Sequence, residues 1–480
     1  MTDPDGGPEE NTYDVVVVGA GAVGENAAGA AAHHGLQVAI VESDLVGGEC
    51  SYWACMPSKT LLRPGEALEA ARRSPGADGA VTGEIDVAAA LERRNRIVHD
   101  WDDSSQEKWL EEEGIDLIRG YARLTGERTL EVLNEDGAVT GLRADKAVVL
   151  ATGSRNVLPE IPGIDQIGVW DSRDATSAQT APESMLIIGG GTVGVEMAQA
   201  WAWLGSQVTI VHRSEHLLSP EEPFAGRELR TALERMGVEV LTEATTRSLA
   251  RSSGEMAVAT VETSDGDVIE IEAEVVVAAT GRQARTEDLG LDTLGLASGG
   301  FIEVNRHMQV DGVDGGWLYA VGDVNGRALF THMGKYQARI AGAHISGRPA
   351  AVSEIPLVPR VIFTSPEIAA VGLTESEAIE AGYDVASLTH DIGDIAGAAT
   401  LGKGYSGTVK LVVDRKEEVV VGATFVGPKT GEMVHAATVA IVGRVPLRAL
   451  WHAVPSFPTL SEVWLRLLEE YRDQGWDPYG

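Results

Sequence analysis

Two copies of a glycine-rich fingerprint constrain this chain more than any other feature. The first, GAGAVG at residues 19–24, follows the apolar run 13–18 and precedes a helical stretch of small residues at 25–34. The second, GGGTVG at 189–194, follows the apolar run 185–188. A single G-x-G-x-x-G is weak evidence because glycine turns are common, but two copies between a strand and a helix predict two dinucleotide-binding βαβ units.

The glycines of each fingerprint are expected to bring backbone amides and a helix N-terminus against a pyrophosphate. They are Gly19, Gly21 and Gly24 in the first unit, and Gly189, Gly191 and Gly194 in the second.

The two units differ at the end of their second strand. Glu42 lies 18 residues beyond Gly24, where a carboxylate accepts hydrogen bonds from a ribose diol. The equivalent place in the second unit holds His212, followed by Arg213. A 2′-phosphate requires a cation and is repelled by a carboxylate, so this pair favours NADPH over NADH. Gly194 favours NAD instead, because a final glycine is more usual there.

Further glycine turns end short strands along the chain. The strand 146–150 ends in Ala151-Thr152-Gly153, and a near copy ends in Ala279-Thr280-Gly281, so Thr152, Gly153 and Gly281 are expected beside a nucleotide. A third strand, 318–321, ends in Gly322-Asp323.

The pattern of segments predicts an α/β chain with two Rossmann-like dinucleotide-binding domains and a separate C-terminal α+β domain. We expect a disordered tail over 1–12, a first nucleotide domain over 13–155 with a return segment over 282–350, a second nucleotide domain over 156–281, and the C-terminal domain over 351–480.

Cys50 and Cys55 are the only cysteines, and they follow the first fingerprint closely. Five residues of regular helix rise about 7.5 Å, whereas a disulfide needs Cα atoms about 4.4 to 6.8 Å apart, so a disulfide between them requires a bent or extended first turn. Such a couple suits a reversible electron relay. No metal is expected, because two cysteines without spaced histidine or cysteine partners do not complete a zinc site.

Composition excludes several classes of protein. The formal net charge is −34, which disfavours nucleic acid and anionic membrane surfaces as partners. No apolar run is long enough to span a bilayer, and no signal peptide is visible. Two cysteines are too few for a secreted disulfide scaffold, so a reducing, cytoplasmic location is expected.

Over nearly its whole length the chain resembles the class I pyridine nucleotide–disulfide oxidoreductases, which include dihydrolipoamide dehydrogenase, glutathione reductase and mercuric reductase. The resemblance rests on the first fingerprint, the block GGECSYWACMPSK at 47–59, the two ATG turns, residues 189–196, Gly322-Asp323, and the motif FPTLSE at 457–462.

The resemblance implies FAD on the first unit, with Glu42 on the adenosine ribose and Asp323 near the ribityl chain. It implies that Cys55 is the thiol against the flavin, and that Cys50 is the interchange thiol that meets the substrate. Lys59 and Glu196 are implied to form an ion pair where hydride arrives. The C-terminal domain is implied to form a homodimer, in which its final motif completes the partner's active site.

The chain departs from the family pattern at Phe457. The family motif usually begins with histidine, the acid and base for the interchange thiol, and Glu462 is left here without that ring to orient. General acid–base help is worth about 10²- to 10⁴-fold in rate, so ordinary disulfide exchange is expected to be slow unless His452, His332 or water substitutes. The larger residues Tyr52 and Trp53 between the cysteines predict a narrower or aromatic substrate face.

The leading hypothesis is therefore a homodimeric FAD enzyme in which NAD(P)H reduces the Cys50–Cys55 disulfide. The dithiol or the flavin then reduces a small-molecule acceptor that needs little proton help: a reactive disulfide, a soft metal ion or a quinone. One alternative is thiolate-dependent carbon–sulfur or carbon–carbon chemistry resembling 2-ketopropyl-coenzyme M carboxylase, which also has phenylalanine at this position. Another is a non-catalytic, redox-sensing flavoprotein.

Overall fold

The computed structural model describes residues 10–479 apart from 253, 255 and 354–356. The chain divides into two compact units that alternate along the sequence. The first contains residues up to Pro57, Arg94–Val157 and Gly281–Glu354, and the second contains Ser58–Arg93, Leu158–Thr280 and the chain from Ile355 onward. The residues 58–93 therefore group with the second nucleotide-binding sheet and the C-terminal sheet.

The first unit is built on a seven-stranded mixed sheet in the order β3-β2-β1-β6-β5-β4, with β16 paired to β6. Strands β3, β2, β1, β6 and β16 run parallel, and β5 and β4 extend the sheet as antiparallel strands. The valines of β1 are buried on both faces, as expected for the centre of a parallel sheet. The strands are β1 (Glu10–Val18), β2 (Val38–Glu42), β3 (Ile115–Arg119), β4 (Tyr121–Gly126), β5 (Thr129–Leu133), β6 (Val139–Leu150) and β16 (Leu318–Ala320).

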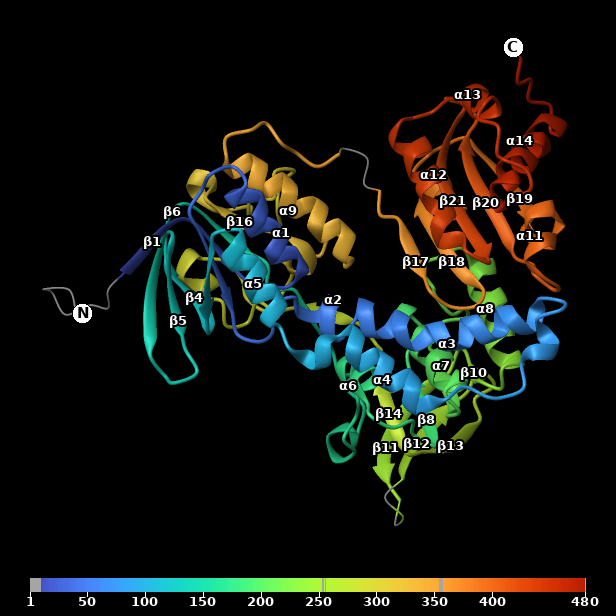
Figure 1. Cartoon of the computed structure of the whole chain (residues 1–480), viewed down its shortest axis with the longest axis horizontal. Helices are drawn as coiled ribbons and strands as arrows, with labels where there is room; N and C mark the ends of the chain where they lie inside the picture. Colours follow the sequence, from blue (N-terminus) through green and yellow to red (C-terminus); the bar gives the residue numbers. More distant parts are fainter. Residues whose placement is uncertain (1–9, 253, 255, 354–356, 480) are drawn as a thin grey trace, which may run out of the picture. The chain divides into compact units, whose positions relative to one another are not determined.

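Two helices, α1 (Ala22–Ala32) and α9 (Thr331–Ile345), pack side by side in this unit (Figure 1). They approach closely because Gly342 faces Ala30, and a Cβ on Gly342 would lie 2.6 Å from the Ala30 methyl.

The second unit contains a parallel sheet in the order β10-β9-β8-β14, which carries the second fingerprint between β8 and α7. An antiparallel ribbon, β11-β12-β13, extends from it. The elements are β8 (Ser184–Ile188), α7 (Thr192–Trp203), β9 (Gln207–Val211), α8 (Pro223–Arg235), β10 (Glu239–Leu241), β11 (Thr245–Arg251), β12 (Ala257–Glu262), β13 (Val268–Ala273) and β14 (Val275–Ala278).

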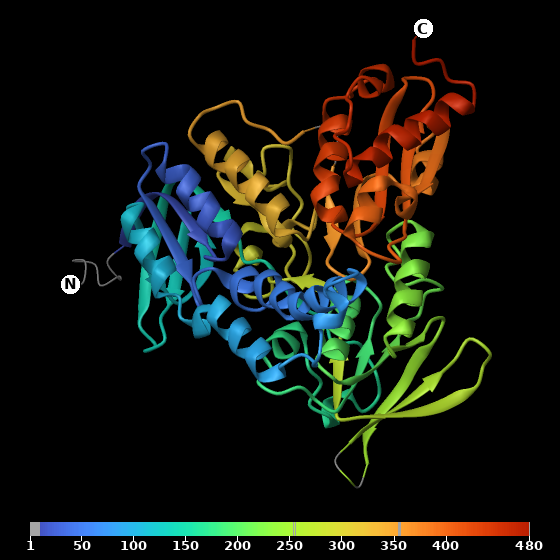
Figure 2. The same ribbon diagram turned by 45° about the vertical axis from the view of Figure 1, so that its right-hand side comes forward.

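The C-terminal part of the second unit is a five-stranded antiparallel sheet in the order β17-β18-β21-β20-β19, drawn in orange and red in Figure 2. Helix α12 (Thr430–Val442) packs on β18 and β21, and α14 (Val463–Asp473) packs on β19. The strands are β17 (Arg360–Ile362), β18 (Glu367–Gly372), β19 (Val385–Asp391), β20 (Thr408–Asp414) and β21 (Val419–Gly427).

The predicted fold class is confirmed, since the chain holds two Rossmann-like parallel sheets and a C-terminal α+β sheet. The tail predicted over 1–12 requires a correction. Residues 10–12 belong to β1 and pair with β6, because that long strand also extends at the end of the sheet opposite to the fingerprint. Residues 1–9 lie outside the described part. Among the described residues, no helix combines the length and the apolar character needed to cross a bilayer.

Candidate active site

The first glycine turn lies against the returning strand β6. Gly19 has φ +98°, and a Cβ there would lie 2.6 Å from the carbonyl oxygen of Ala151. A Cβ on Gly24 would lie 1.8 Å from the carbonyl oxygen of Gly19, so glycine is required for the helix to approach the turn. In the described part of the chain no side chain caps α1, whose first amides are therefore left for an anionic ligand. The turn fits the pyrophosphate of a dinucleotide.

Glu42 closes this turn from the end of β2. Its carboxylate accepts hydrogen bonds from the backbone N–H of Ala20 at 2.7 Å and of Asp44 at 2.8 Å. Burial raises the pKa of Glu42, and these backbone hydrogen bonds oppose the rise.

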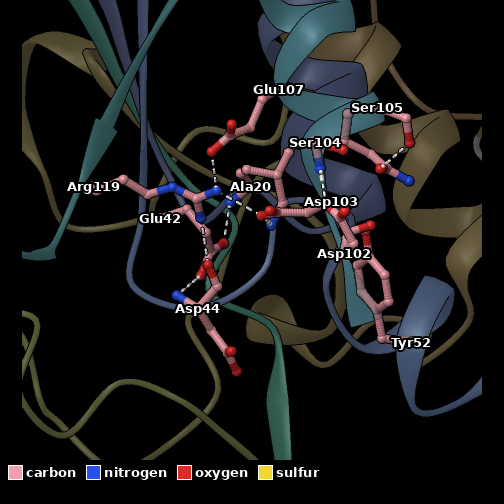
Figure 3. A network of polar contacts seen from close by, with 12 residues as sticks. Ala20, Glu42, Asp44, Tyr52, Asp102, Asp103, Ser104, Ser105, Glu107 and Arg119 are labelled. Atoms are coloured by element: carbon pink, nitrogen blue, oxygen red, sulfur yellow. Dashed lines mark hydrogen bonds and ion pairs between the residues drawn. The ribbon is translucent and has the colours of Figure 1, made fainter. Parts of the chain in front are cut away.

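Arg119 holds the loop that follows Glu42, as Figure 3 shows. Its guanidinium donates to the Asp44 carbonyl at 2.5 Å and to Asp103 Oδ2 at 2.6 Å, and it pairs with Glu107. Sequence reasoning missed this network because its members are far apart in the chain, and no local motif marks Arg119.

The first ATG turn, the segment that follows the second one, and Gly322-Asp323 all belong to the first unit. The Thr152 hydroxyl donates to the Arg285 carbonyl at 2.9 Å. The Ser154 hydroxyl donates to Asp323 Oδ2 at 2.6 Å and accepts from Arg282 Nε at 2.7 Å. This relay fixes the Asp323 carboxylate, and neither Ser154 nor Arg282 was predicted as a site residue.

Two of the predicted turn glycines have backbone conformations suited to a sharp turn with open space beside them. Gly153 has φ +71° and Gly281 has φ +144°, and a Cβ built on either meets no described atom within 4 Å. Gly322 packs against Val23 of α1, and a Cβ on Gly322 would lie 3.1 Å from Val23 Cγ1. The residues predicted for the first cofactor thus line one region of the first unit.

The two cysteines lie on different helices. Cys50 is in α2 (Gly48–Tyr52), Trp53 leaves helical geometry with φ −134°, and Cys55 begins α3 (Cys55–Arg73). The break expected from the disulfide geometry is therefore present. A Cβ on Gly48 would lie 2.7 Å from Gly21 Cα, so the turn before the cysteines packs directly on the first fingerprint.

Both cysteines are free thiols. The hydrogen bond to Cys55 and burial raise the pKa of the Cys50 thiol, whereas a hydrogen bond from Thr331 and the charge of Lys335 lower it.

Tyr52 does not contribute to a substrate face. Its side chain is completely buried, and burial is the main reason that its pKa rises to about 12. Its ring lies 5.7 Å from that of Trp53, which is half-buried. Of the two aromatic residues, only Trp53 is placed to shape access to the thiols.

Lys59 and Glu196 form an ion pair in the second unit, with Lys59 Nζ 2.7 Å from Glu196 Oε2. The other carboxylate oxygen accepts the backbone N–H of Phe363 at 3.0 Å. Lys59 lies one turn beyond Cys55 on α3.

The second glycine turn resembles the first in detail. Gly189 has φ +120°, and a Cβ there would lie 2.3 Å from the carbonyl oxygen of Ala279. Helix α7 begins beside Gly191 and, within the described residues, is not capped by a side chain. A Cβ on Gly194 would lie 2.0 Å from the carbonyl oxygen of Gly189. A second dinucleotide fits here.

His212 is part of this turn and not a free cation. Its Nδ1 accepts the backbone N–H of Gly190 at 3.1 Å, and its Nε2 lies 3.0 Å from the His216 carbonyl oxygen. Burial is the main cause that lowers the pKa of His212. The hydrogen bond to the His216 carbonyl opposes this change, and the charge of Arg213 adds to it. The cation at this position is therefore the exposed Arg213.

Phe457 is 75% exposed, and Glu462 is buried. Glu462 Oε1 accepts from Arg466, whereas Oε2 has no hydrogen-bond partner among the described residues. His332 and His452, the two histidines considered as substitutes for a proton-transferring group, are both exposed.

Comparison with known proteins identifies the framework of this site. Residues 13–347 match the family model for pyridine nucleotide-disulphide oxidoreductases, and residues 358–467 match the dimerisation domain of the same family. The chain belongs to the pyridine nucleotide-disulphide oxidoreductase family.

Similar members of the family include enzymes with different acceptors. The chain is 31% identical over 456 residues to a mercuric reductase from Staphylococcus aureus, covering 94% of this chain and 81% of that protein. It is 35% identical over 458 residues to a dihydrolipoyl dehydrogenase from Chlorobaculum tepidum, covering 94% and 95%. A solved structure, the Cu(II) complex of the HOCl-induced flavoprotein disulfide reductase RclA from Escherichia coli, matches with a TM-score of 0.83 at 25% identity, covering 96% and 99%.

As a pyridine nucleotide-disulphide oxidoreductase, the protein is an FAD-dependent enzyme that uses NAD(P)H. The match to the dimerisation domain supports a homodimer. The glycine cradles of both units fit the two dinucleotides.

Proposed function

We propose that this enzyme transfers electrons from NADPH through the Cys50–Cys55 couple to a soft metal ion such as Hg(II) or Cu(II). The observation that carries the proposal is Phe457, an exposed phenylalanine where the resemblance leads us to expect a proton-transferring histidine. A neighbouring carboxylate, Glu462, keeps one oxygen unpartnered among the described residues.

The proton balance separates the acceptor classes. Reduction of a disulfide or a quinone by NADPH adds two electrons and two protons to the acceptor, so a positioned acid accelerates it. Reduction of Hg(II) to Hg(0), or of two Cu(II) to two Cu(I), adds two electrons and no proton. An active site without a histidine at position 457 therefore favours a metal ion, and thiolates are ligands that soft metals prefer.

The names of two similar proteins agree with this class of acceptor. One is a mercuric reductase, and another was solved as a complex with Cu(II). The metal ion is a substrate in this proposal. Cys50 and Cys55 would bind it as thiolates, and the couple would return to the disulfide as one Hg(II) takes up two electrons or two Cu(II) take up one electron each.

The site residues receive the following roles. Gly19, Gly21, Gly24, Glu42, Thr152, Gly153, Gly322 and Asp323 hold FAD, which when bound passes an electron pair from nicotinamide to the disulfide. Gly189, Gly191, Gly194 and His212 hold the nicotinamide dinucleotide, and Arg213 binds a 2′-phosphate. Lys59 and Glu196 orient the region where hydride arrives. In the homodimer, the motif that contains Phe457 and Glu462 faces the partner's thiols.

Steady-state consumption of NADPH under anaerobic conditions tests the acceptor. We expect turnover with Hg(II) and Cu(II) salts and, at equal concentration, little turnover with small disulfides or quinones. Cys50→Ser and Cys55→Ser should each abolish metal-dependent turnover. Higher turnover with disulfides or quinones than with both metals would refute the proposal. Substrate-dependent carbon–sulfur cleavage would support the carboxylase-like alternative, and no turnover with any acceptor would support the redox sensor.

A further inference from the structure

Thr331 lies outside every motif considered above, yet its hydroxyl contacts one thiol of the pair. Thr331 Oγ1 is 3.4 Å from Cys55 Sγ, and Thr331 is among the groups that lower the pKa of the Cys50 thiol. All three residues belong to the first unit. The hydroxyl group therefore touches the Cys55 sulfur of the redox couple.

Packing holds Thr331 in place independently of the cysteines. Thr331 is the first residue of α9, and Gly334 in the same turn packs against α1. A Cβ on Gly334 would lie 2.4 Å from Val23 Cγ2 and 3.1 Å from Gly322 Cα. The start of α9 is thus seated against both the first fingerprint helix and the Gly322-Asp323 turn, so the hydroxyl has a defined position.

The charged groups around the couple favour a negative sulfur. Lys335 follows Thr331 by one helical turn, and its charge acts on Cys50. Glu25 of α1 interacts with Lys335, and Glu49 of α2 pairs with Arg285 at 3.2 Å. The carboxylate of Glu25 therefore has Lys335 as a nearby cation, and the carboxylate of Glu49 has Arg285.

We propose that Thr331 is a positioning residue of the redox couple, whose hydroxyl hydrogen-bonds to the Cys55 sulfur and stabilises the dithiol relative to the disulfide. When the S–S bond breaks, an electron pair supplied by NAD(P)H through the family's flavin leaves one sulfur as thiolate, and one proton makes the other a thiol. A hydroxyl group donates one hydrogen bond, so it can donate to the Cys55 sulfur when that sulfur is the thiolate. The neutral sulfurs of a disulfide are weaker acceptors than a thiolate.

The Thr331 hydroxyl should therefore shift the equilibrium between the Cys50–Cys55 disulfide and the dithiol toward the dithiol. Removing the hydroxyl without changing the shape of the side chain, as in Thr331→Val, should make the disulfide harder to reduce. A hydrogen bond of this kind corresponds to about threefold to tenfold in the equilibrium constant. Thr331→Ser keeps the hydroxyl and should restore most of the wild-type value.

The test uses the FAD-loaded protein under anaerobic conditions, equilibrated in dithiothreitol redox buffers at one neutral pH. The samples are quenched with acid, and reduced thiols are counted by alkylation and mass spectrometry. Thr231→Val is the matched control, because the Thr231 hydroxyl donates to the carbonyl of Arg227 in its own helix α8, far along the chain from the thiols. This control should leave the equilibrium constant of the couple unchanged.

A shift in Thr331→Val that Thr331→Ser reverses supports the inference. An unchanged equilibrium in Thr331→Val overturns it, and so does an equal shift in the valine and serine variants, because packing would then be the cause. The inference rests on the proposed function only in requiring that the couple cycles. If Cys50 and Cys55 of the wild-type enzyme never form the disulfide, both proposals are refuted. If the disulfide forms and is reduced but the enzyme does not turn over with metal ions, only the proposed function is refuted.

Discussion

Glu196 is a buried carboxylate whose charge is balanced by Lys59. The side chain of Glu196 is 4% exposed and that of Lys59 is 33% exposed, and their charged atoms are 2.7 Å apart. Lys59 Nζ also lies 4.9 Å from the centre of the Phe363 ring, whose backbone N–H binds the other oxygen of Glu196. The pair joins α3 to α7 and to the segment after β17 within the second unit.

Replacing Lys59 with methionine should destabilise the enzyme, because it leaves the Glu196 charge buried without its partner. We expect a loss of roughly 1 to 3 kcal/mol in the free energy of unfolding, less than for a fully buried pair because Lys59 is partly exposed. Urea unfolding measures this loss. The double variant Lys59→Met/Glu196→Gln should recover part of it, and a double variant less stable than Lys59→Met would contradict the explanation.

Replacing Phe457 with histidine should change the relative rates at which the enzyme reduces disulfides and metal ions. In Phe457→His, we expect the rate of disulfide reduction to rise by about 10- to 100-fold, because a general acid becomes available. The rate of metal reduction should change little. Phe457→Gln is the control, since it adds polarity without a group that titrates near neutral pH. Equal gains in the glutamine and histidine variants would show that polarity, and not proton transfer, is responsible.

Arg213 should determine the choice between the two nicotinamide cofactors. His212 is neutral and bound to Gly190, so the exposed guanidinium of Arg213 is the group available to a 2′-phosphate. Arg213→Ala should raise KM for NADPH by about tenfold or more, as expected for loss of a charge-assisted hydrogen bond, and leave KM for NADH nearly unchanged. Steady-state kinetics with each cofactor measures both. An equal change in KM for NADPH and in KM for NADH would show that Arg213 does not bind the 2′-phosphate.

Glu25 should make stability fall as pH rises. Burial is the main cause that raises its pKa to about 7 from an ordinary value of 4.5, the nearby Lys335 opposes the rise, and Glu42 adds to it. The folded enzyme therefore binds the proton more tightly than the unfolded chain, and stability from this group is lost between about pH 4.5 and pH 7.

Glu25→Gln should thus be more stable than the wild type above pH 7, by roughly 1 to 3 kcal/mol, and similar to it near pH 4.5. Urea unfolding of both proteins across this range gives the difference directly. A difference that does not vary with pH would show that Glu25 does not titrate in this range in the folded enzyme.

Much of the fold was predictable because its signals are local. The strands predicted at 13–18 and 185–188 and the helix predicted at 25–34 are defined by short runs of apolar or small residues and by glycines. The structure contains them within about three residues of the predicted bounds. The glycines at 19, 24, 189 and 194 are required by contacts of less than 3 Å that any Cβ would make. Such requirements act on single positions, so they are visible in the amino-acid sequence.

The amino-acid sequence by itself determined the fold class, the two nucleotide turns, the closely spaced thiols and the unusual Phe457. Only the tertiary structure decided that Thr331 contacts the Cys55 sulfur. It also decided that His212 is hydrogen-bonded within its own turn, that Ser154 and Arg282 hold Asp323, and that Tyr52 faces the core. These relationships join residues that are distant in the chain or depend on the direction of a side chain. Neither hydrophobic periodicity nor motif spacing records which polar atoms meet once the strands and helices have packed.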